Sequence, residues 1–148
     1  MHLSIQLVAP RNRSGSTHQL SQDYEVRLRA YSDVVTERYP SEARLLAKAE
    51  TVSGRTAPRL VLLDSRGTPL SSEGLAAWIG RERDSGAQHL IFAIGPADGW
   101  SAAARARAHL LLSFGPMTFP HELARVMLTE QLYRAFTILS GHPYHSGH

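Results

Sequence analysis

The stretch that decides the fold runs from Leu110 to His145 and reads LLLSFGPMTFPHELARVMLTEQLYRAFTILSGHPYH. It begins with an apolar run that Gly115 and Pro116 interrupt. Pro120 is then expected to open a long helix, because a proline at the first helical position gives up no hydrogen bond. The helix continues without Gly or Pro until Gly141, which is expected to end it. A short polar tail follows.

The apolar residues of this predicted helix lie on more than one side. One stripe at helical spacing consists of Leu128, Leu132, Ala135, Phe136 and Leu139. Other faces carry Leu123, Val126, Met127, Tyr133 and Ile138. A helix that is apolar on most sides is buried on most sides. Because a short chain has little core with which to bury such a helix, we expect a second copy of the chain to pack against it, giving a homodimer.

Several short motifs occur together in this stretch. They are Leu112-Ser113-Phe114, Met117-Thr118-Phe119-Pro120-His121, Arg125-Val126, Glu130-Gln131, Tyr133-Arg134-Ala135 and Tyr144-His145. In this combination they resemble the C-terminal signature of the SPOUT-class ribosomal RNA large subunit methyltransferase H family. The resemblance implies an enzyme that uses S-adenosylmethionine to methylate N3 of a pseudouridine in large-subunit ribosomal RNA. It also implies a homodimer that acts on an assembled ribosomal particle.

Upstream of this stretch, apolar runs that predict strands alternate with segments of helical character. The strands are expected at residues 3–9, 33–39, 60–63, 89–94 and 110–114. The helices are expected at 17–30, 41–52, 71–84, 102–108 and 120–140, with a loop at 65–69. This alternation predicts an α/β fold, a three-layer α/β/α sandwich with a mostly parallel sheet, in one domain over residues 1–148. The resemblance adds a C-terminal trefoil knot.

Composition restricts the function classes. No apolar run is long enough to span a membrane, and the N-terminus lacks the basic-then-apolar order of a signal peptide. The chain has no cysteine, which excludes disulfides and thiolate metal sites, and its histidines are scattered, so no metal site is expected. These features favour the cytoplasm. The net charge is +3, and every basic residue except Lys48 is arginine, which agrees with an RNA partner or with a lineage bias toward arginine.

Three predicted strands end in loops at Leu63, Ile94 and Phe114. Ligands of parallel sheets bind beyond the carboxyl ends of the strands, where backbone amides are free. The resemblance implies that main-chain groups of these same loops bind S-adenosylmethionine. The residues carried over for this role are Leu63, Gly95, Phe114, Gly115, Pro116, Met117, Thr118 and Phe119.

The expected reaction is direct displacement at a sulfonium methyl carbon, aided mainly by orientation and by a base that removes the N3 proton. Four residues are candidates for contact with the reacting base, and each has a structural alternative. Asp98 is also typical of an Asx turn, and His121 of a helix start. Tyr144 and His145 either close over the target base or form an exposed tail.

Three arginines are candidates for RNA phosphate: Arg11, Arg125 and Arg134. Arg125 and Arg134 could equally contact the partner subunit. Arg134 follows Glu130 by four residues, so a surface ion pair on the helix is a further alternative.

The chain departs from its relatives at the expected cofactor loops. Relatives usually carry two glycines where this chain has Gly95-Pro96, and often Ser followed by Lys or Ala where it has Gly115-Pro116. They carry Val-Gly-Lys where it has Ala9-Pro10-Arg11. Proline removes an N–H donor, so a non-catalytic RNA- or ribosome-binding relative is the second hypothesis. An α/β enzyme for a small anionic metabolite, which rests on fold alone, is the third.

Overall fold

The computed structural model describes residues 1–9 and 15–145, which contain one five-stranded sheet. The strands are β1 (His2–Val8), β2 (Asp33–Tyr39), β3 (Arg59–Pro69), β4 (His89–Ile94) and β5 (Leu110–Ser113). They lie in the order β2-β1-β4-β3-β5, and every neighbouring pair is parallel. All the carboxyl ends therefore meet at one edge of the sheet, and the predicted parallel α/β class is confirmed.

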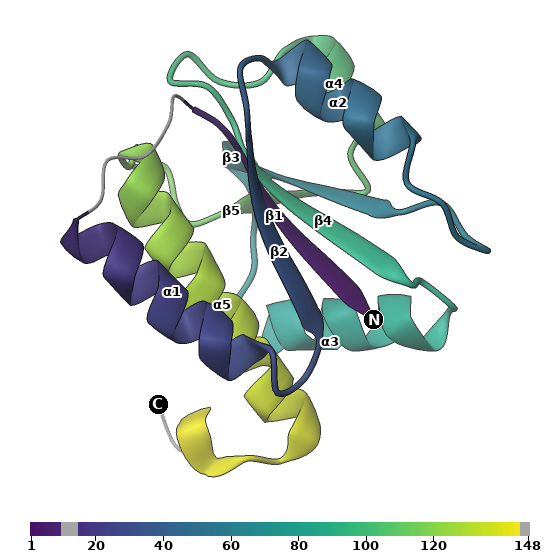
Figure 1. Cartoon of the computed structure of the whole chain (residues 1–148), viewed down its shortest axis with the longest axis vertical. Coiled ribbons are helices and arrows are strands. Elements are labelled where there is room, and N and C mark those ends of the chain that lie inside the picture. Colours follow the sequence, from purple (N-terminus) through teal and green to yellow (C-terminus); the bar gives the residue numbers. More distant parts are fainter. Residues whose placement is uncertain (10–14, 146–148) are drawn as a thin grey trace.

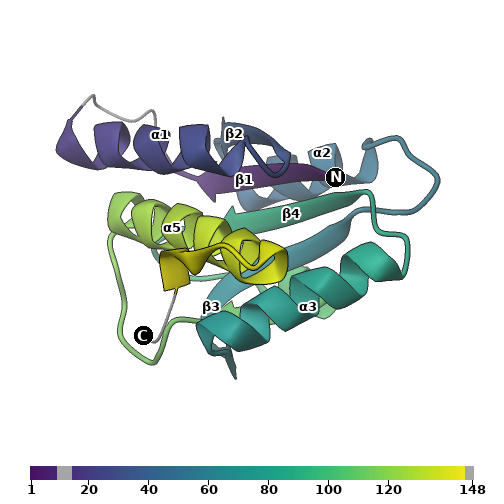
Figure 2. The ribbon, with the colours of Figure 1, turned by 90° about the horizontal axis from the view of Figure 1, so that it is seen from below.

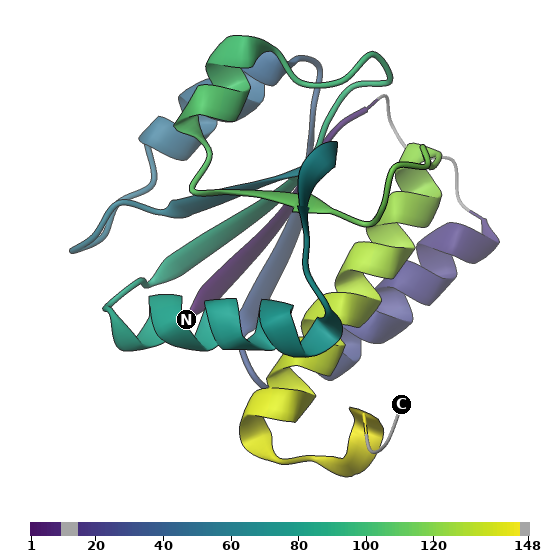
Figure 3. The same ribbon diagram turned by 180° about the vertical axis from the view of Figure 1, so that it is seen from behind.

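Helices cover both faces of the sheet (Figures 1 and 2). The described helices are α1 (Ser16–Leu28), α2 (Glu42–Glu50), α3 (Ser72–Asp84), α4 (Ala102–Arg107), α5 (His121–Ser140) and the 3-10 turn η1 (Pro143–His145). Buried side chains of α1, α3 and α5 pack in one hydrophobic cluster, and those of α2 and α4 pack in a second one. Seen from behind, α4 and α2 lie together at one end of the sheet, away from α3 and α5 (Figure 3). The layers are those of the expected sandwich.

The central strands are buried on both faces. β4 is apolar from Leu90 to Ile94, which is typical of a parallel strand covered on both sides, whereas β1 also buries the polar side chains of Ser4 and Gln6. Ile5 on β1 and Phe92 on β4 are fully buried, and Trp78 of α3 packs edge-on against Phe92. None of the helices in the described ranges combines the length and apolar character needed to cross a membrane.

Serine side chains cap the N-termini of three of the described helices. Ser41, Ser71 and Ser101 each accept a hydrogen bond from the backbone N–H three residues later, which satisfies one free donor of the first turn. Each of these serines lies directly before the first residue of its helix. The carboxylate of Glu42 in turn accepts hydrogen bonds from the backbone N–H and the hydroxyl of Ser101, so α2 is joined to the start of α4.

The long helix α5 starts at His121, one residue later than expected, with Pro120 in an extended conformation before it. Gly141 ends it as predicted, with a left-handed φ of 75°. Leu128, Leu132, Ala135 and Phe136 of the predicted stripe are buried. Leu123, on another face, is 47% exposed, so α5 is not fully covered within one chain.

The predicted loop at residues 65–69 is wrong, since β3 continues to Pro69. Its first part pairs with β5 up to Leu63, the register then shifts, and Thr68 and Pro69 pair with β5 again. Gly67 allows this second pairing. A Cβ at that position would lie 2.5 Å from the carbonyl oxygen of Leu111, so only a residue without a side chain lets the two backbones come so close.

Candidate functional site

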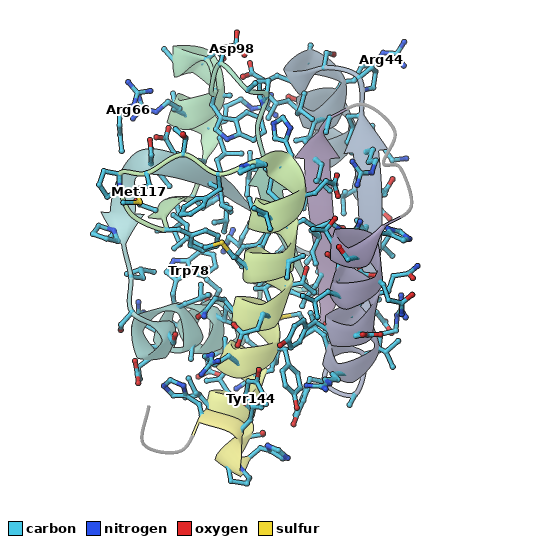
Figure 4. The ribbon with its side chains drawn as sticks, turned by 90° about the vertical axis from the view of Figure 1, so that its left-hand side faces the viewer. Arg44, Arg66, Trp78, Asp98, Met117 and Tyr144 are labelled. Atoms are coloured by element: carbon cyan, nitrogen blue, oxygen red, sulfur yellow. The ribbon has the colours of Figure 1, made fainter. Side chains whose placement is uncertain are left out.

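A cavity of about 430 Å³ lies beyond the carboxyl ends of β4 and β5, beside the point after Leu63 where the regular part of β3 ends. Its volume is in the range of small-molecule sites. Seven of the eight residues predicted to bind the cofactor line it, namely Leu63, Gly95, Phe114, Gly115, Met117, Thr118 and Phe119. Pro116 is exposed and is not part of the lining. Asp98 and His121 also line the cavity, and Figure 4 shows Asp98, Arg66 and Met117 at this end of the molecule.

The turn after β5 is fixed by Ser113. Its hydroxyl oxygen accepts a hydrogen bond from the Gly115 N–H at 2.9 Å and lies 3.1 Å from the Ser65 carbonyl oxygen, to which the hydroxyl can donate. Gly115 has a φ of 113°, a conformation that a side chain would disfavour. Sequence reasoning assigned Ser113 no role beyond its place in the signature. The structure assigns it to the shape of the loop.

The turn after β4 is built around Trp100, which sequence reasoning missed. Its indole N–H donates to the Leu63 carbonyl oxygen at 2.9 Å. A Cβ on Gly95 would lie 2.7 Å from the indole ring, so the ring lies directly against the Gly95 backbone. The Pro96 carbonyl accepts from the Gly99 N–H at 2.9 Å, and Gly99 has a φ of 88°. The chain therefore turns sharply here even though Pro96 has no N–H.

A buried carboxylate lies beside the cavity. The Asp64 side chain is 6% exposed and pairs with Arg105, with 2.9 Å between Nε and Oδ2. It also accepts the backbone N–H of Arg66 at 2.8 Å. The Arg66 guanidinium itself is 67% exposed at the rim of the cavity. The sequence does not predict this pair, because nothing in it indicates that Arg105 folds back to Asp64.

Arg125 does not lie on the surface, which contradicts its predicted contact with RNA. Its side chain is 4% exposed and pairs with Glu25 of α1 at 3.0 Å. One of its nitrogens also lies 3.3 Å from Nδ1 of His18, and Glu25 accepts a further hydrogen bond from Thr36. This cluster joins α1, β2 and α5 in the interior. A phosphate could reach Arg125 only if the two helices separated.

The tail residues fold back onto α5. The Tyr144 hydroxyl donates to Glu130 at 3.1 Å, and its ring packs edge-on against Tyr133 with 4.7 Å between centroids. Burial, helped by hydrogen bonding and the charge of Glu130, raises the pKa of Tyr144. Arg134 pairs with Glu130, with 2.8 Å between Nε and Oε1. The ion pair foreseen as the alternative for Arg134 is therefore present.

His145 anchors the end of this tail to α3. Its Nε2 lies 2.7 Å from a carboxylate oxygen of Glu73, and that hydrogen bond lowers the pKa of Glu73. Its Nδ1 lies 2.8 Å from a guanidinium nitrogen of Arg134. Neither tail candidate is a loose terminal residue.

The four candidates for contact with the target base fall into two groups. Asp98 and His121 lie at the cavity, whereas Tyr144 contacts α5 at Tyr133. Tyr133 lies twelve positions after His121 on α5, which corresponds to a rise of about 18 Å along the helix axis. Figure 4 shows Tyr144 and Asp98 at opposite ends of the molecule. Arg11, the third RNA candidate, lies outside the described residues.

Comparison with family models gives one match over nearly the whole chain. The model described as "Predicted SPOUT methyltransferase" matches residues 1–145. It therefore includes every predicted cofactor residue.

Curated relatives carry one name. A ribosomal RNA large subunit methyltransferase H from Koribacter versatilis is 50% identical over 138 residues, which are 93% of this chain and 94% of the relative. The protein of that name from Brucella ovis is 56% identical over 95 residues, 64% of this chain and 55% of the relative. Among solved structures, the SpoU methyltransferase AviRb from Streptomyces viridochromogenes, in complex with AdoMet, has a TM-score of 0.48 and 13% identity. That match covers 90% of this chain and 57% of the other.

Proposed function

The chain belongs to the SPOUT methyltransferase family, and from this premise we propose that it transfers a methyl group from S-adenosylmethionine to N3 of a pseudouridine in large-subunit ribosomal RNA. The observation that carries the proposal is the convergence on one cavity of seven predicted cofactor residues, which come from β3 and from the loops after β4 and β5. The name of the relatives supports ribosomal RNA as the substrate. Such a substrate also supports a cytoplasmic location.

The cavity suits a cofactor held mainly by backbone groups. Gly95 and Gly115 present bare main chain to it, while Leu63, Phe114 and Met117 add apolar walls. When bound, S-adenosylmethionine supplies a methyl group on a cationic sulfur that needs no metal for activation. The work of the chain is to orient the donor against the base and to exclude water. We propose the seven lining residues as its contacts, with Pro116 acting only through the shape of the loop.

The N3 proton of the target base must leave as the new carbon–nitrogen bond forms. We propose that Tyr144 and His145 contact the base in the cavity of a second copy, while Asp98 and His121 line the cavity that receives it. The separation along α5 within one chain motivates this arrangement, because the two groups cannot act on one base from the same protomer. Arg11 and Arg134 remain the proposed contacts with RNA phosphate.

The proposed homodimer has a candidate surface. Three exposed apolar residues lie close together in the sequence, where the loop after β5 leads into α5. They are Met117, Phe119 and Leu123, and Met117 is 74% exposed. Val126 and Met127 are half-buried on the next turn. Exposed apolar residues within one segment support this segment as the proposed dimer contact. The trefoil knot that the family resemblance implies stays a prediction.

The test is calorimetric titration with S-adenosylmethionine followed by transfer of a labelled methyl group to ribosomal particles. We expect saturable binding and label in large-subunit RNA. A matched pair of variants sharpens the result. Gly115→Ala places a side chain at a positive φ inside the cavity and should lose both signals, whereas Gly54→Ala in an exposed turn should keep them.

The second hypothesis, a non-catalytic relative that binds the ribosome, is favoured by one feature only. Pro96 lines the cavity and has no N–H to offer a ligand. That hypothesis predicts RNA binding with no transferred label. Absence of binding heat at millimolar cofactor, with RNA binding retained, would favour it over the enzyme.

A further inference from the structure

We propose that Trp100 is a positioning residue of the methyl-donor site, an inference that rests on the proposed function. Its indole joins the ends of two neighbouring strands and forms a wall of the cavity against which the bound cofactor lies. No part of the family resemblance assigned a role to this position.

A hydrogen bond joins β3 to the loop after β4. The Leu63 carbonyl stands at the end of the regular part of β3, and the Trp100 indole N–H donates to it at 2.9 Å. The same ring lies within 2.7–3.0 Å of where a Gly95 Cβ would be. Leu63 and Gly95 both belong to the proposed cofactor contacts, so one side chain sets the spacing between them.

Trp100 is itself held from both sides. On its N-terminal side the Gly99–Pro96 hydrogen bond closes the turn. On its C-terminal side, Ser101 donates its backbone N–H and its hydroxyl to the Glu42 carboxylate, at 2.8 and 2.6 Å. The ring is 6% exposed and packs with α2 and α4 residues. Such a side chain has little freedom to move away when a ligand enters.

The Trp100 ring also borders the space proposed for the ligand. Trp100 lines the cavity together with Leu63 and Gly95. An aromatic face or edge at such a wall suits a flat, partly apolar ligand group. Loss of the indole should therefore weaken cofactor binding through two effects: the wall is removed and the two strand ends are no longer joined.

Fluorescence tests the placement without changing Trp100. The chain has two tryptophans, so Trp78→Phe leaves Trp100 as the sole indole emitter, and its packing against Phe92 tolerates a phenyl ring. We expect S-adenosylmethionine to change the remaining emission in a saturable way, with the dissociation constant that calorimetry gives for the unmodified chain. Calorimetric binding with no change in emission would overturn the inference.

Variants at Trp100 test the role. Trp100→Phe keeps a ring but loses the donor, and should weaken cofactor binding by roughly 3–10-fold, the size of one neutral hydrogen bond. Trp100→Leu loses both and should weaken it further. The turnover number at saturating cofactor should stay unchanged while the cofactor KM rises. Unchanged affinity in both variants, with only a lower Tm, would mean a purely structural role. If the unmodified chain gives no binding heat at all, the proposed function fails and this inference fails with it.

Discussion

Arg125 places a positive charge in the interior between α1 and α5, where Glu25 neutralises it at 3.0 Å. Removal of one partner of a buried pair leaves the other charge unsatisfied, at a cost of about 3–5 kcal/mol. We therefore expect Arg125→Ala to lower the Tm by on the order of 10 °C. Thermal unfolding by circular dichroism measures this. Arg44→Ala on the exposed face of α2 is the matched control and should leave the Tm unchanged. Equal Tm values for the two variants would refute the buried role.

A pH effect is expected at the amino end of the sheet. Burial, with a contribution from nearby His2, lowers the pKa of His89 below its usual 6.5, and Ser4 lies 2.6 Å from its Nε2. The unfolded chain then binds the proton first as pH falls. The contribution of His89 is complete above pH 6.5 and is lost progressively below it.

The Tm should therefore fall between about pH 7.5 and pH 5.5, and His89→Gln should make that fall smaller. Differential scanning calorimetry at the two pH values measures both slopes, with His142→Gln in the exposed C-terminal turn as the control. If His89→Gln and the unmodified chain lose the same number of degrees, another group is responsible.

At this scale, the sequence predicted residues that act through the backbone better than residues that act through charge. Gly95 and Gly115 lie at the cavity because their loops follow apolar strands that the sequence reveals. The burial of the Arg125 side chain depends on its pairing with Glu25, which lies a hundred residues away on a different helix. Trp100 was missed for a similar reason, since only the folded turn brings its indole to Leu63.

Among the elements, the pairing of β3 with β5 determines the shape of the loops around the cavity. Gly67 permits that pairing, because a Cβ there would meet the Leu111 carbonyl at 2.5 Å. We expect Gly67→Ala to destabilise the fold by about 1–3 kcal/mol through overpacking. Denaturant unfolding measures the difference. Gly54→Ala, whose new Cβ meets no atom closer than the side-chain oxygen of Gln88 at 3.1 Å, should cost much less. Equal losses in the free energy of unfolding for the two variants would show that β3 and β5 separate easily.

The elements themselves were largely predictable, because apolar runs, serine caps and Gly141 mark their ends locally. The second half of β3 was not, since Ser65 to Pro69 have the composition of a loop. Pairing with β5 provides backbone partners that outweigh that local preference. Strand order was likewise beyond the sequence, because it depends on contacts between segments far apart in the chain.

For the whole molecule, the central question is whether two copies associate through the apolar surface at the start of α5. We expect Leu123→Glu to convert a dimer into a 16.3 kDa monomer, because a carboxylate in an interface loses its hydration. Sedimentation velocity measures the mass. Val35→Glu, on the other face of the sheet and 52% exposed, is the control and should stay dimeric. A monomeric unmodified chain would refute the proposed assembly.

If the tail acts on the cavity of the partner, two inactive variants should complement each other. Gly115→Ala damages the cavity, and His145→Ala removes a proposed base contact. Mixed dimers contain one intact cavity facing one intact tail, so labelled-methyl transfer should reappear on mixing. Activity that stays absent after exchange of subunits would place both groups in the same protomer's reaction.

Mass spectrometry of nucleosides from large-subunit ribosomal RNA tests the central claim most directly. RNA from cells that lack this chain should contain no N3-methylpseudouridine. The modification should return when the unmodified chain is supplied, but not when Gly115→Ala is supplied at equal abundance. If the modified nucleoside persists in cells without the chain, or returns fully with that variant, a methyl-donor site at the ends of β3, β4 and β5 is contradicted.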